Sequence, residues 1–374
     1  MGVMHPLGKR IRLARPALGR DEASALRLVL RDGFLTGGPR IEAFERSVAA
    51  AAGARFAVAV SSGTAALFLA LRAAGVGQGD EVILPGFTFP ATAGAVVAAA
   101  ARPVVCDVDP RSFNLDPAKL EAALTPRTRA VMPVHLFGLP APMPPILEFA
   151  RAHGLKVIED AACALGARLD GRPCGAAGDL GCFSFHPRKI VTTGEGGAVV
   201  SNDEELVAKV RLLRNHGIRR TAAGMEFELP AFNFRLSDLH AAVGLAQMKH
   251  LSAQLELRRE LAAAMRAELN GLPWLQLPEE PAGSSHGWQS FVVRLAPDVD
   301  RAALLDHLGR DAIEAVPGAY ALHLTRAFAP LVAPAAPPVS AELHRSTLAL
   351  PFHTFLRPVE LHRIAESLAG FRKG

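Results

Sequence analysis

One lysine of the sequence stands in a setting that suits covalent chemistry. Lys189 follows residues 184–188 (SFHPR) and precedes the glycine-rich stretch 192–197 (TTGEGG). Most lysines lie on protein surfaces, but here apolar strands are expected on both sides, at 182–185 and 197–201, and the glycines let backbone approach a ligand closely. A desolvated lysine loses its proton more readily and can form a Schiff base with a carbonyl carbon.

Two acidic residues, Glu159 and Asp160, end the apolar stretch 155–158 (LKVI). Carboxylates at the carboxyl end of a buried parallel strand face the crevice where ligands bind, and a buried charge needs a partner. A protonated ring nitrogen would be such a partner. An aspartate that caps the next helix is the alternative, and these residues alone leave both interpretations open.

A phosphate site is indicated by residues 61–65 (SSGTA), which follow an expected strand and open a helix. The free N–H groups of a helix N-terminus, its dipole and a hydroxyl together suit a phosphate. The same residues also make an ordinary N-cap, which is the alternative. Asn233 adds a polar group in the aromatic run 232–235 (FNFR), just before a helix expected near Ser237.

The elements that position these residues follow a βαβ rhythm from about 55 to 200. Short β-branched runs alternate with alanine-rich helical stretches, which predicts a mostly parallel central sheet sandwiched by helices, an α/β fold. The close strands at 182–185 and 197–201 suit a sheet edge or a local antiparallel return. Asn202 and Glu205 resemble a capping box for the next helix, with Gly217 as its stop.

Two domains are expected. After Gly271 the composition of the sequence changes. A connector rich in Pro, Gly and Ser is followed by an expected strand, an expected helix and further short elements. We therefore predict a large domain over residues 1–251, including the N-terminal segment, and a smaller C-terminal α+β domain over 252–374.

The composition argues against a disordered chain, a nucleic-acid-binding protein and a membrane-spanning protein. Of 374 residues, 50% are hydrophobic and 21% charged, which is the profile of a folded chain. The net charge of +5 is spread without a block of like charges, so no nucleic-acid partner is expected. The four cysteines form no C-x-x-C pair, and the longest apolar run, 91–101, is too short to span a membrane. We expect a cytoplasmic protein without a membrane segment.

Two glycine motifs and the histidines are poor candidates for chemistry. Residues 283–287 (GSSHG) match the serine-hydrolase pattern, but a loop precedes them and a strand follows, whereas a nucleophile elbow needs the strand before and a helix after. The GEGG of 194–197 runs into a strand and lacks the full dinucleotide spacing. The thirteen histidines fall at no ligand spacing, so no metal site is expected.

Read together, these segments resemble the DegT/DnrJ/EryC1/StrS aminotransferases, the sugar aminotransferases of fold type I that use pyridoxal phosphate. The resemblance covers the chain nearly end to end. It is carried by the stretches SSGTAALFLAL, GDEVILPGFTFPATA, ALTPRTRAVMPVHLFG, GLKVIEDAA, GDLGCFSFHPRK, TTGEGGAVVSND, RNHG and FNFRLSDLHAAVGLAQ.

The resemblance implies a role for each matching residue. Lys189 is similar to the lysine that binds the cofactor aldehyde and then moves the proton, and Asp160 to the carboxylate that pairs with the pyridinium nitrogen. Phe89 resembles the aromatic residue that stacks on the pyridine ring. The phosphate cradle would consist of Gly63, Thr64, Ala65 and Ser184, together with Asn233 from the neighbouring subunit of a homodimer with shared active sites.

One cofactor position departs from the family pattern. Three residues after the aspartate the family usually has Gln or His near the 3-oxygen of the cofactor, and here it is Cys163, a weaker hydrogen-bonding group. The substrate segment, 313–324, resembles the family only loosely. The candidate substrate residues are His186, Arg235, Tyr320 and His323.

The function implied is transamination of a keto sugar, a nucleotide-linked 4-keto or 3-keto deoxyhexose, with glutamate as amino donor. A pyridoxamine-dependent sugar dehydratase is one alternative, but that group typically carries His where this chain has Lys189. A non-catalytic sugar-binding or regulatory protein of the same fold is the other.

Overall fold

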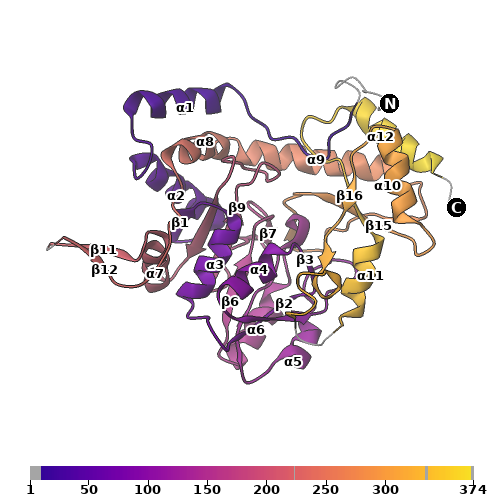
Figure 1. Ribbon diagram of the computed structural model, residues 1–374. Helices are drawn as coiled ribbons and strands as arrows, with labels where there is room; N and C mark the ends of the chain where they lie inside the picture. The colour runs from indigo at the N-terminus through magenta and orange to yellow at the C-terminus, as the bar shows by residue number, and fades with distance from the viewer. Residues whose placement is uncertain (1–9, 223, 333–335, 372–374) are drawn as a thin grey trace.

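A seven-stranded sheet forms the centre of the molecule (Figure 1). The computed structural model describes residues 10–222, 224–332 and 336–371. In spatial order the strands are β1 (Phe56–Val60), β10 (Gly197–Ser201), β9 (Leu180–Ser184), β6 (Lys156–Asp160), β5 (Thr128–Val131), β2 (Glu81–Pro85) and β4 (Arg102–Cys106). The α/β class with a mostly parallel sheet is confirmed.

One strand runs against the others in this sheet. The strands β9, β6, β5, β2 and β4 are parallel, whereas β10 is antiparallel to both of its neighbours, β1 and β9. The expected antiparallel return is therefore made by β10 alone. The carboxyl ends of β6 and β9 are neighbours, so Asp160 and Ser184 end their strands at the same edge of the sheet.

Helices cover both faces of the sheet because side chains alternate along each strand. Val58 and Val60 of β1 lie in the apolar cluster with α3, α4 and α7, while Ala57 and Ala59 lie with α2 and α8. Around β5 and β6 the second face is covered by α5 and α6. These helices are α2 (Pro39–Ala52), α3 (Gly63–Ala73), α4 (Ala91–Ala98), α5 (Leu120–Ala123), α6 (Met143–Ala152), α7 (Glu204–Arg214) and α8 (Asp238–Met248). Across the described ranges no helix is long and apolar enough to cross a membrane.

Helix caps place the loops that carry candidate residues. The hydroxyl of Ser62 accepts the N–H of Ala65 at 3.0 Å and begins α3. The expected capping box at Asn202 is wrong by one residue: Asp203 caps α7, and the Asn202 side chain instead accepts the N–H of Arg55. Asp203 and not Asn202 takes the N-cap position because its carboxylate accepts two N–H groups at the positive end of the helix.

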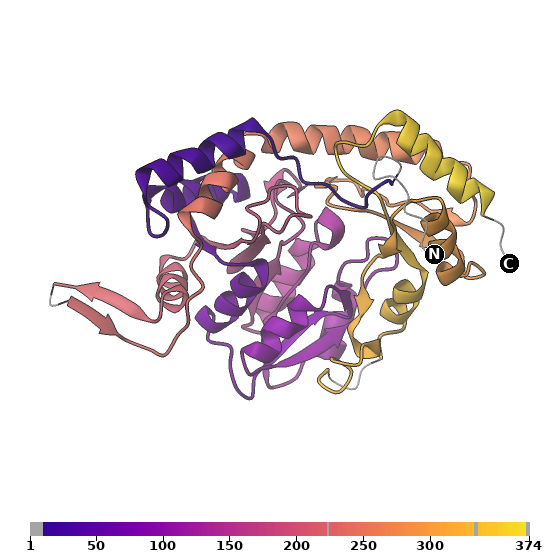
Figure 2. The ribbon, with the colours of Figure 1, turned by 45° about the horizontal axis from the view of Figure 1, so that its top comes forward.

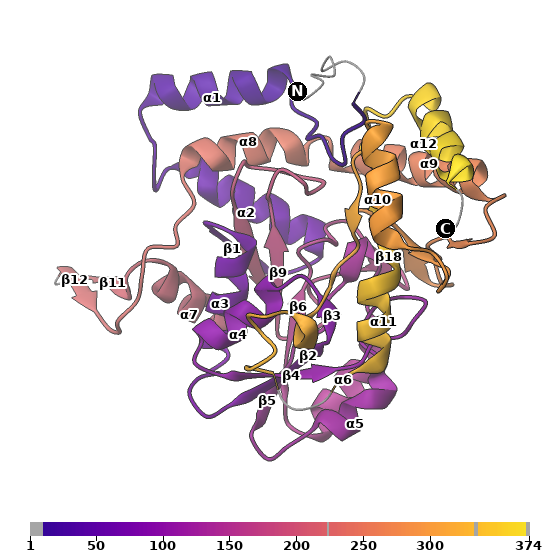
Figure 3. The same ribbon diagram turned by 45° about the vertical axis from the view of Figure 1, so that its right-hand side comes forward.

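The C-terminal part packs around a core of its own. The helix α9 (Leu251–Leu269) runs across the top of the molecule in Figure 2 and lies beside α12 (Pro358–Gly370). A four-stranded antiparallel sheet lies below them, flanked by α10 (Arg301–Arg310) and α11 (Pro338–Ser346), as Figure 3 shows. Its strands in spatial order are β13 (Leu275–Gln276), β15 (Phe291–Leu295), β18 (Thr347–Leu350) and β16 (Val316–Pro317).

The two predicted domains meet at the first residues of α9. Ile11, from the N-terminal segment, bridges to Ile313 and shares the C-terminal apolar cluster. The boundary at 251/252 stays a prediction. Residues 1–9 of the predicted large domain, and 333–335 and 372–374 of the small one, lie outside the described residues.

Short pairings join the remaining segments. A three-stranded sheet consists of β14 (Ser284–Ser285), β7 (Arg168–Leu169) and β8 (Arg172–Pro173), and β17 (Tyr320–Ala321) pairs with β3 (Phe87–Thr88). Near the N-terminus α1 (Arg20–Asp32) packs on α8. A hairpin of β11 (Ile218–Thr221) and β12 (Gly224–Phe227) extends away from the body past α7 (Figures 1 and 2).

Candidate active site

The register of β6 decides which of its two acidic residues faces the site. Asp160 lies on the α4 side of the sheet, where the Thr92 hydroxyl donates to its Oδ2 at 2.8 Å and the Ala162 N–H to its Oδ1 at 3.2 Å. Asp160 is 5% exposed. Burial raises the pKa of its carboxyl, against the effect of the Thr92 and Ala162 hydrogen bonds. In the described part of the chain no cationic side chain forms an ion pair with it, so the carboxyl can take a protonated ring nitrogen.

Glu159 points to the opposite face and has a structural role. Its carboxylate accepts the N–H groups of Gly175, Ala177 and Gly178 at 2.7–2.8 Å. His135 Nε2 lies 2.9 Å from it, and because His135 Nδ1 accepts the Ala141 N–H, the ring proton sits on Nε2 and is donated to Glu159. The acidic pair of the sequence therefore separates into one site residue and one core residue.

The loop after β9 presents Lys189. The Lys189 N–H donates to the His186 carbonyl at 2.8 Å, and the N–H groups of Phe185 and Thr193 tie the two ends of the loop together. The Lys189 amine lies 2.9 Å from the sulfur of Cys163, which follows β6. The structure thus brings Lys189 and Cys163 into direct contact and sets both beside the strand that ends in Asp160.

The residues of the predicted phosphate cradle lie between α3 and the end of β9. A Cβ atom on Gly63 would lie 2.7 Å from the Cβ of Ser184, so only glycine lets these segments approach. In the residues described, the N–H groups of Gly63 and Thr64 have no acceptor, since the Ser62 hydroxyl takes only the N–H of Ala65. These donors at a helix N-terminus, with the Ser184 hydroxyl beside them, fit a phosphate.

Asn233 and Arg235 are placed differently from the other predicted residues. The Phe234 carbonyl accepts the Ser61 N–H at 2.9 Å, which holds this segment at the end of β1. Both side chains are exposed: Asn233 Oδ1 accepts the Arg235 N–H, and the Arg235 guanidinium donates to Asn215. Neither side chain contacts Lys189 within the part of the chain that is described.

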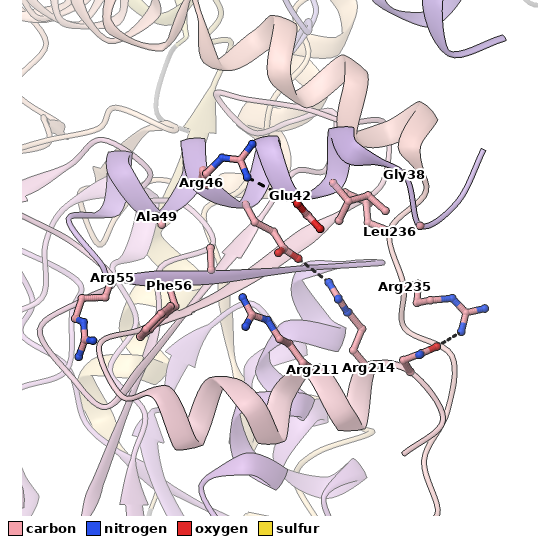
Figure 4. A pocket seen from close by; sticks show the side chains of 15 residues that line it. Gly38, Glu42, Arg46, Ala49, Arg55, Phe56, Arg211, Arg214, Arg235 and Leu236 are labelled. Atoms are coloured by element: carbon pink, nitrogen blue, oxygen red, sulfur yellow. Dashed lines mark hydrogen bonds and ion pairs between the residues drawn. The ribbon is translucent and has the colours of Figure 1, made fainter. Parts of the chain in front are cut away.

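Figure 4 shows the groove that Arg235 lines, about 570 Å³ in volume, along the free edge of β1 between α2 and α7. Glu45 accepts the Ala59 N–H, and Arg214 donates to the Ala59 carbonyl and to Glu45. These two charged side chains cover the edge strand. No predicted cofactor residue lines the groove.

Two of the candidate substrate residues, Tyr320 and His323, belong to the C-terminal part, and a third, His186, lies on the lysine loop. Tyr320 pairs with Thr88 through β17 and β3, directly beside Phe89, which is 65% exposed. Burial lowers the pKa of His323, whose Nδ1 is buried without a partner among the described groups. His186, on the lysine loop, also has a pKa lowered by burial, and its Nδ1 accepts the Arg188 N–H. Both imidazoles therefore favour the neutral form.

Two threonines were missed from the sequence. Thr92 donates to Asp160, and Thr88 lies 3.2 Å from Thr92, so a buried chain of hydroxyls leads from β3 to the carboxyl. The sequence offered little signal, because Thr88 ends the short strand β3, Thr92 lies in the first turn of α4, and the contact of Thr92 with Asp160 joins residues far apart in the chain.

The chain is similar to known proteins in both sequence and structure. Residues 16–369 match the model of the DegT/DnrJ/EryC1/StrS aminotransferase family. A protein of Acidithiobacillus ferrooxidans named UDP-N-acetyl-3-dehydro-alpha-D-glucosamine 3-aminotransferase is 43% identical, with 92% of each chain covered. GDP-perosamine synthase of Caulobacter vibrioides is 38% identical, covering 96% of this chain and 97% of its own.

A solved structure with the same fold is that of DesV from S. venezuelae. It superposes with a TM-score of 0.87 at 38% identity and covers 93% of both chains. The resemblance inferred from the motifs is thereby confirmed. The chain belongs to the DegT/DnrJ/EryC1/StrS aminotransferase family, and it is a pyridoxal-phosphate-dependent aminotransferase.

Proposed function

We propose that this enzyme transfers an amino group from glutamate to the keto carbon of a nucleotide-linked deoxyhexose, at C3 or C4. The observation that carries the reaction type is that the Lys189 amine, in contact with Cys163, and the buried Asp160 carboxyl, which lacks an ion-pair partner among the described residues, lie at the same edge of the sheet. The names of the two relatives, a 3-aminotransferase of a UDP-linked sugar and a GDP-perosamine synthase, support the substrate class.

Each site residue then has a task. When bound, pyridoxal phosphate supplies an electron sink for the carbon that loses its proton. Asp160 keeps the ring nitrogen protonated, with Thr92 fixing the orientation of the carboxyl. Gly63, Thr64 and Ser184 hold the phosphate. The Lys189 amine would take the proton from the donor carbon and deliver it to C4′ of the cofactor in the first half-reaction, and would move a proton from C4′ to the sugar carbon in the second.

We also propose that the working unit is a cytoplasmic homodimer. The hairpin β11–β12 extends away from the body and carries Met225 and Phe227, which are 61% and 71% exposed. A lone two-stranded hairpin is marginally stable in water, so a partner surface has to cover it. Asn233, just beyond the hairpin, would then reach the phosphate in the partner's site. Four unpaired cysteines support the cytoplasmic location.

Spectroscopy tests the reaction type. Wild-type enzyme with pyridoxal phosphate should show a visible absorption band that glutamate bleaches with release of one 2-oxoglutarate per site. Lys189→Ala should lose transamination by about 1,000-fold or more, while Lys209→Ala, an exposed lysine on α7, should match wild type. A wild-type protein that stays colourless would overturn the assignment in favour of a non-catalytic role. A coloured protein that releases no 2-oxoglutarate would favour the dehydratase.

A further inference from the structure

Two strained aromatic residues meet close to the lysine loop. Phe137 has φ 58° and Trp288 has φ 46°, in the left-handed region that bulky residues rarely adopt. Their turns are joined because Gln289 N–H donates to the Phe137 carbonyl at 3.0 Å and Gly287 N–H to the Gly138 carbonyl at 2.8 Å. Strained backbone persists only where its surroundings hold it, and it concentrates at functional sites.

The backbone of Trp288 is held from both sides. Its N–H donates to His286 Nδ1 at 2.7 Å, and the two rings stack with centroids 4.1 Å apart. Arg258, from α9, donates to the Trp288 carbonyl at 2.9 Å. Each of these contacts would be lost if the turn relaxed to a negative φ, so together they fix the strained conformation.

Arg258 makes this turn hard to rearrange. Its guanidinium is buried and, among the described residues, has no carboxylate partner; its acceptors are the carbonyls of Trp288 and Gln289. Burial lowers the pKa of Arg258 to about 10, so the group still carries its charge at neutral pH. A buried cation that loses its acceptors is costly. The charge therefore depends on the turn staying as it is.

The side chain of Gln289 leads from this turn to the lysine loop. Gln289 is 7% exposed, and its amide Nε2 donates to the carbonyl of Arg188, the residue directly before Lys189. The Phe137 turn is connected to the second site residue, Asp160. Two residues before Phe137, the His135 N–H donates to the Asp160 carbonyl at 3.0 Å. The Phe137 turn, the Trp288 turn and Gln289 thus form one hydrogen-bonded frame. This frame joins the backbone at Arg188, next to Lys189, to the backbone at Asp160.

We infer that Gln289 is a positioning residue for the reaction: its amide, held by the strained Trp288 turn and Arg258, fixes the Arg188 carbonyl and thereby the distance of the Lys189 amine from Asp160. This rests on the proposed function, because it takes Lys189 as the reacting amine. Gln289 touches no reacting atom and acts only through the backbone of the loop.

The test replaces the donor without changing the size of the side chain. Gln289→Met removes the amide, and Gln289→Asn keeps it one methylene too short to reach. A displacement of the amine on the scale of an ångström lowers kcat by about 10- to 100-fold, with the KM for glutamate within about twofold. The pH midpoint of the cofactor's absorption band should shift by about half a unit or more, since it reports the surroundings of Lys189. Gln289→His, whose ring N–H reaches about as far, should restore both readouts.

Gln247→Met is the matched control, because Gln247 is also buried and donates to a backbone carbonyl, that of Ala17, far along the chain from the lysine loop. It should lower thermal stability without moving kcat or the midpoint. The inference is overturned if Gln289→Met and Gln289→Asn both leave the midpoint and kcat at wild-type values, or if Gln247→Met shifts them equally. Failure of the proposed function would look different, since wild type itself would then lack the band.

Discussion

The Lys189 amine lies 2.9 Å from the sulfur of Cys163, a contact between the loop after β9 and the loop after β6. Sulfur is a weak hydrogen-bond acceptor, so this contact holds the amine without pairing its charge. Within the described residues Lys189 has no carboxylate within ion-pair distance. The amine is therefore held in place without being engaged in an ion pair. A residue that must both form a Schiff base and transfer protons requires this.

Cys163 should be the single thiol that reports cofactor binding. Cys106, Cys174 and Cys182 are buried, and burial raises the pKa of Cys106 to about 12 and that of Cys182 well above its usual value. We expect iodoacetamide to alkylate Cys163 alone in the cofactor-free native protein and pyridoxal phosphate to suppress the labelling, as peptide mass mapping would show. Cys163→Ser supplies the unlabelled control. Labelling of Cys182 at the same rate would contradict this arrangement.

The fold was largely predictable because its signals are local and repeated. Apolar runs with helical crossovers identify the parallel sheet, and the residues at strand ends, Asp160 and Ser184, indicate the site edge. The roles of Glu159 and Asp160 were not separable from sequence, because strand register, and not residue type, decides which carboxylate faces α4. Thr92 was missed because its contact with Asp160 joins residues 68 positions apart in the sequence.

The frame around Gln289 could not be predicted at all. The frame and the residues that it joins come from five segments distant in the sequence, and the strained φ angles at Phe137 and Trp288 follow from tertiary contacts that oppose local preference. The capping error at Asn202 has the opposite origin, since two neighbouring residues could both serve as caps and the helix dipole selected Asp203.

Replacing Asp160 by asparagine should stabilise the cofactor-free protein while it damages catalysis. Burial raises the pKa of Asp160 in the folded state, so its favourable contribution is greatest below the unfolded pKa and is lost as pH rises through the folded value. The stability of Asp160→Asn relative to wild type should therefore grow as the pH rises above the unfolded pKa, about 3.9, measured by urea unfolding without cofactor. Transamination should fall by about 100-fold or more. A stability difference that shrinks with rising pH would refute the sign.

Glu159→Gln should lower the stability of the folded protein and leave cofactor binding unchanged. One amide nitrogen would face the donors Gly175 N–H and His135 Nε2–H, which costs about 3 kcal/mol. Burial alone would raise the pKa of Glu159, but the hydrogen bonds of His135, Gly178 and Gly175 lower it. Its contribution is thus present above the unfolded pKa, about 4.3, and is lost as pH falls. Urea unfolding at pH 7 and pH 4 should show a smaller acid loss in the variant.

Gly63→Ala should weaken cofactor binding specifically. The new Cβ would lie 2.7 Å from the Cβ of Ser184 and push α3 away from the end of β9, an overpacking cost of about 1–3 kcal/mol. We expect the Kd for pyridoxal phosphate to rise by about tenfold or more, measured by titration of the absorption band. Gly309→Ala, in α10, where an added Cβ meets nothing within 4 Å, is the control and should bind normally. Equal affinities for the two variants would argue against the cradle.

Mixing two inactive variants tests whether each site draws on both subunits. Lys189→Ala removes the amine from its own site, whereas Asn233→Ala would remove the phosphate contact from the partner's site. Unfolding and refolding the two together yields heterodimers in which one of two sites is intact, so about a quarter of wild-type activity per site should return. The double variant Lys189→Ala/Asn233→Ala mixed with wild type controls for exchange. If Asn233 served its own subunit, every heterodimer would instead hold two defective sites and no activity would be recovered.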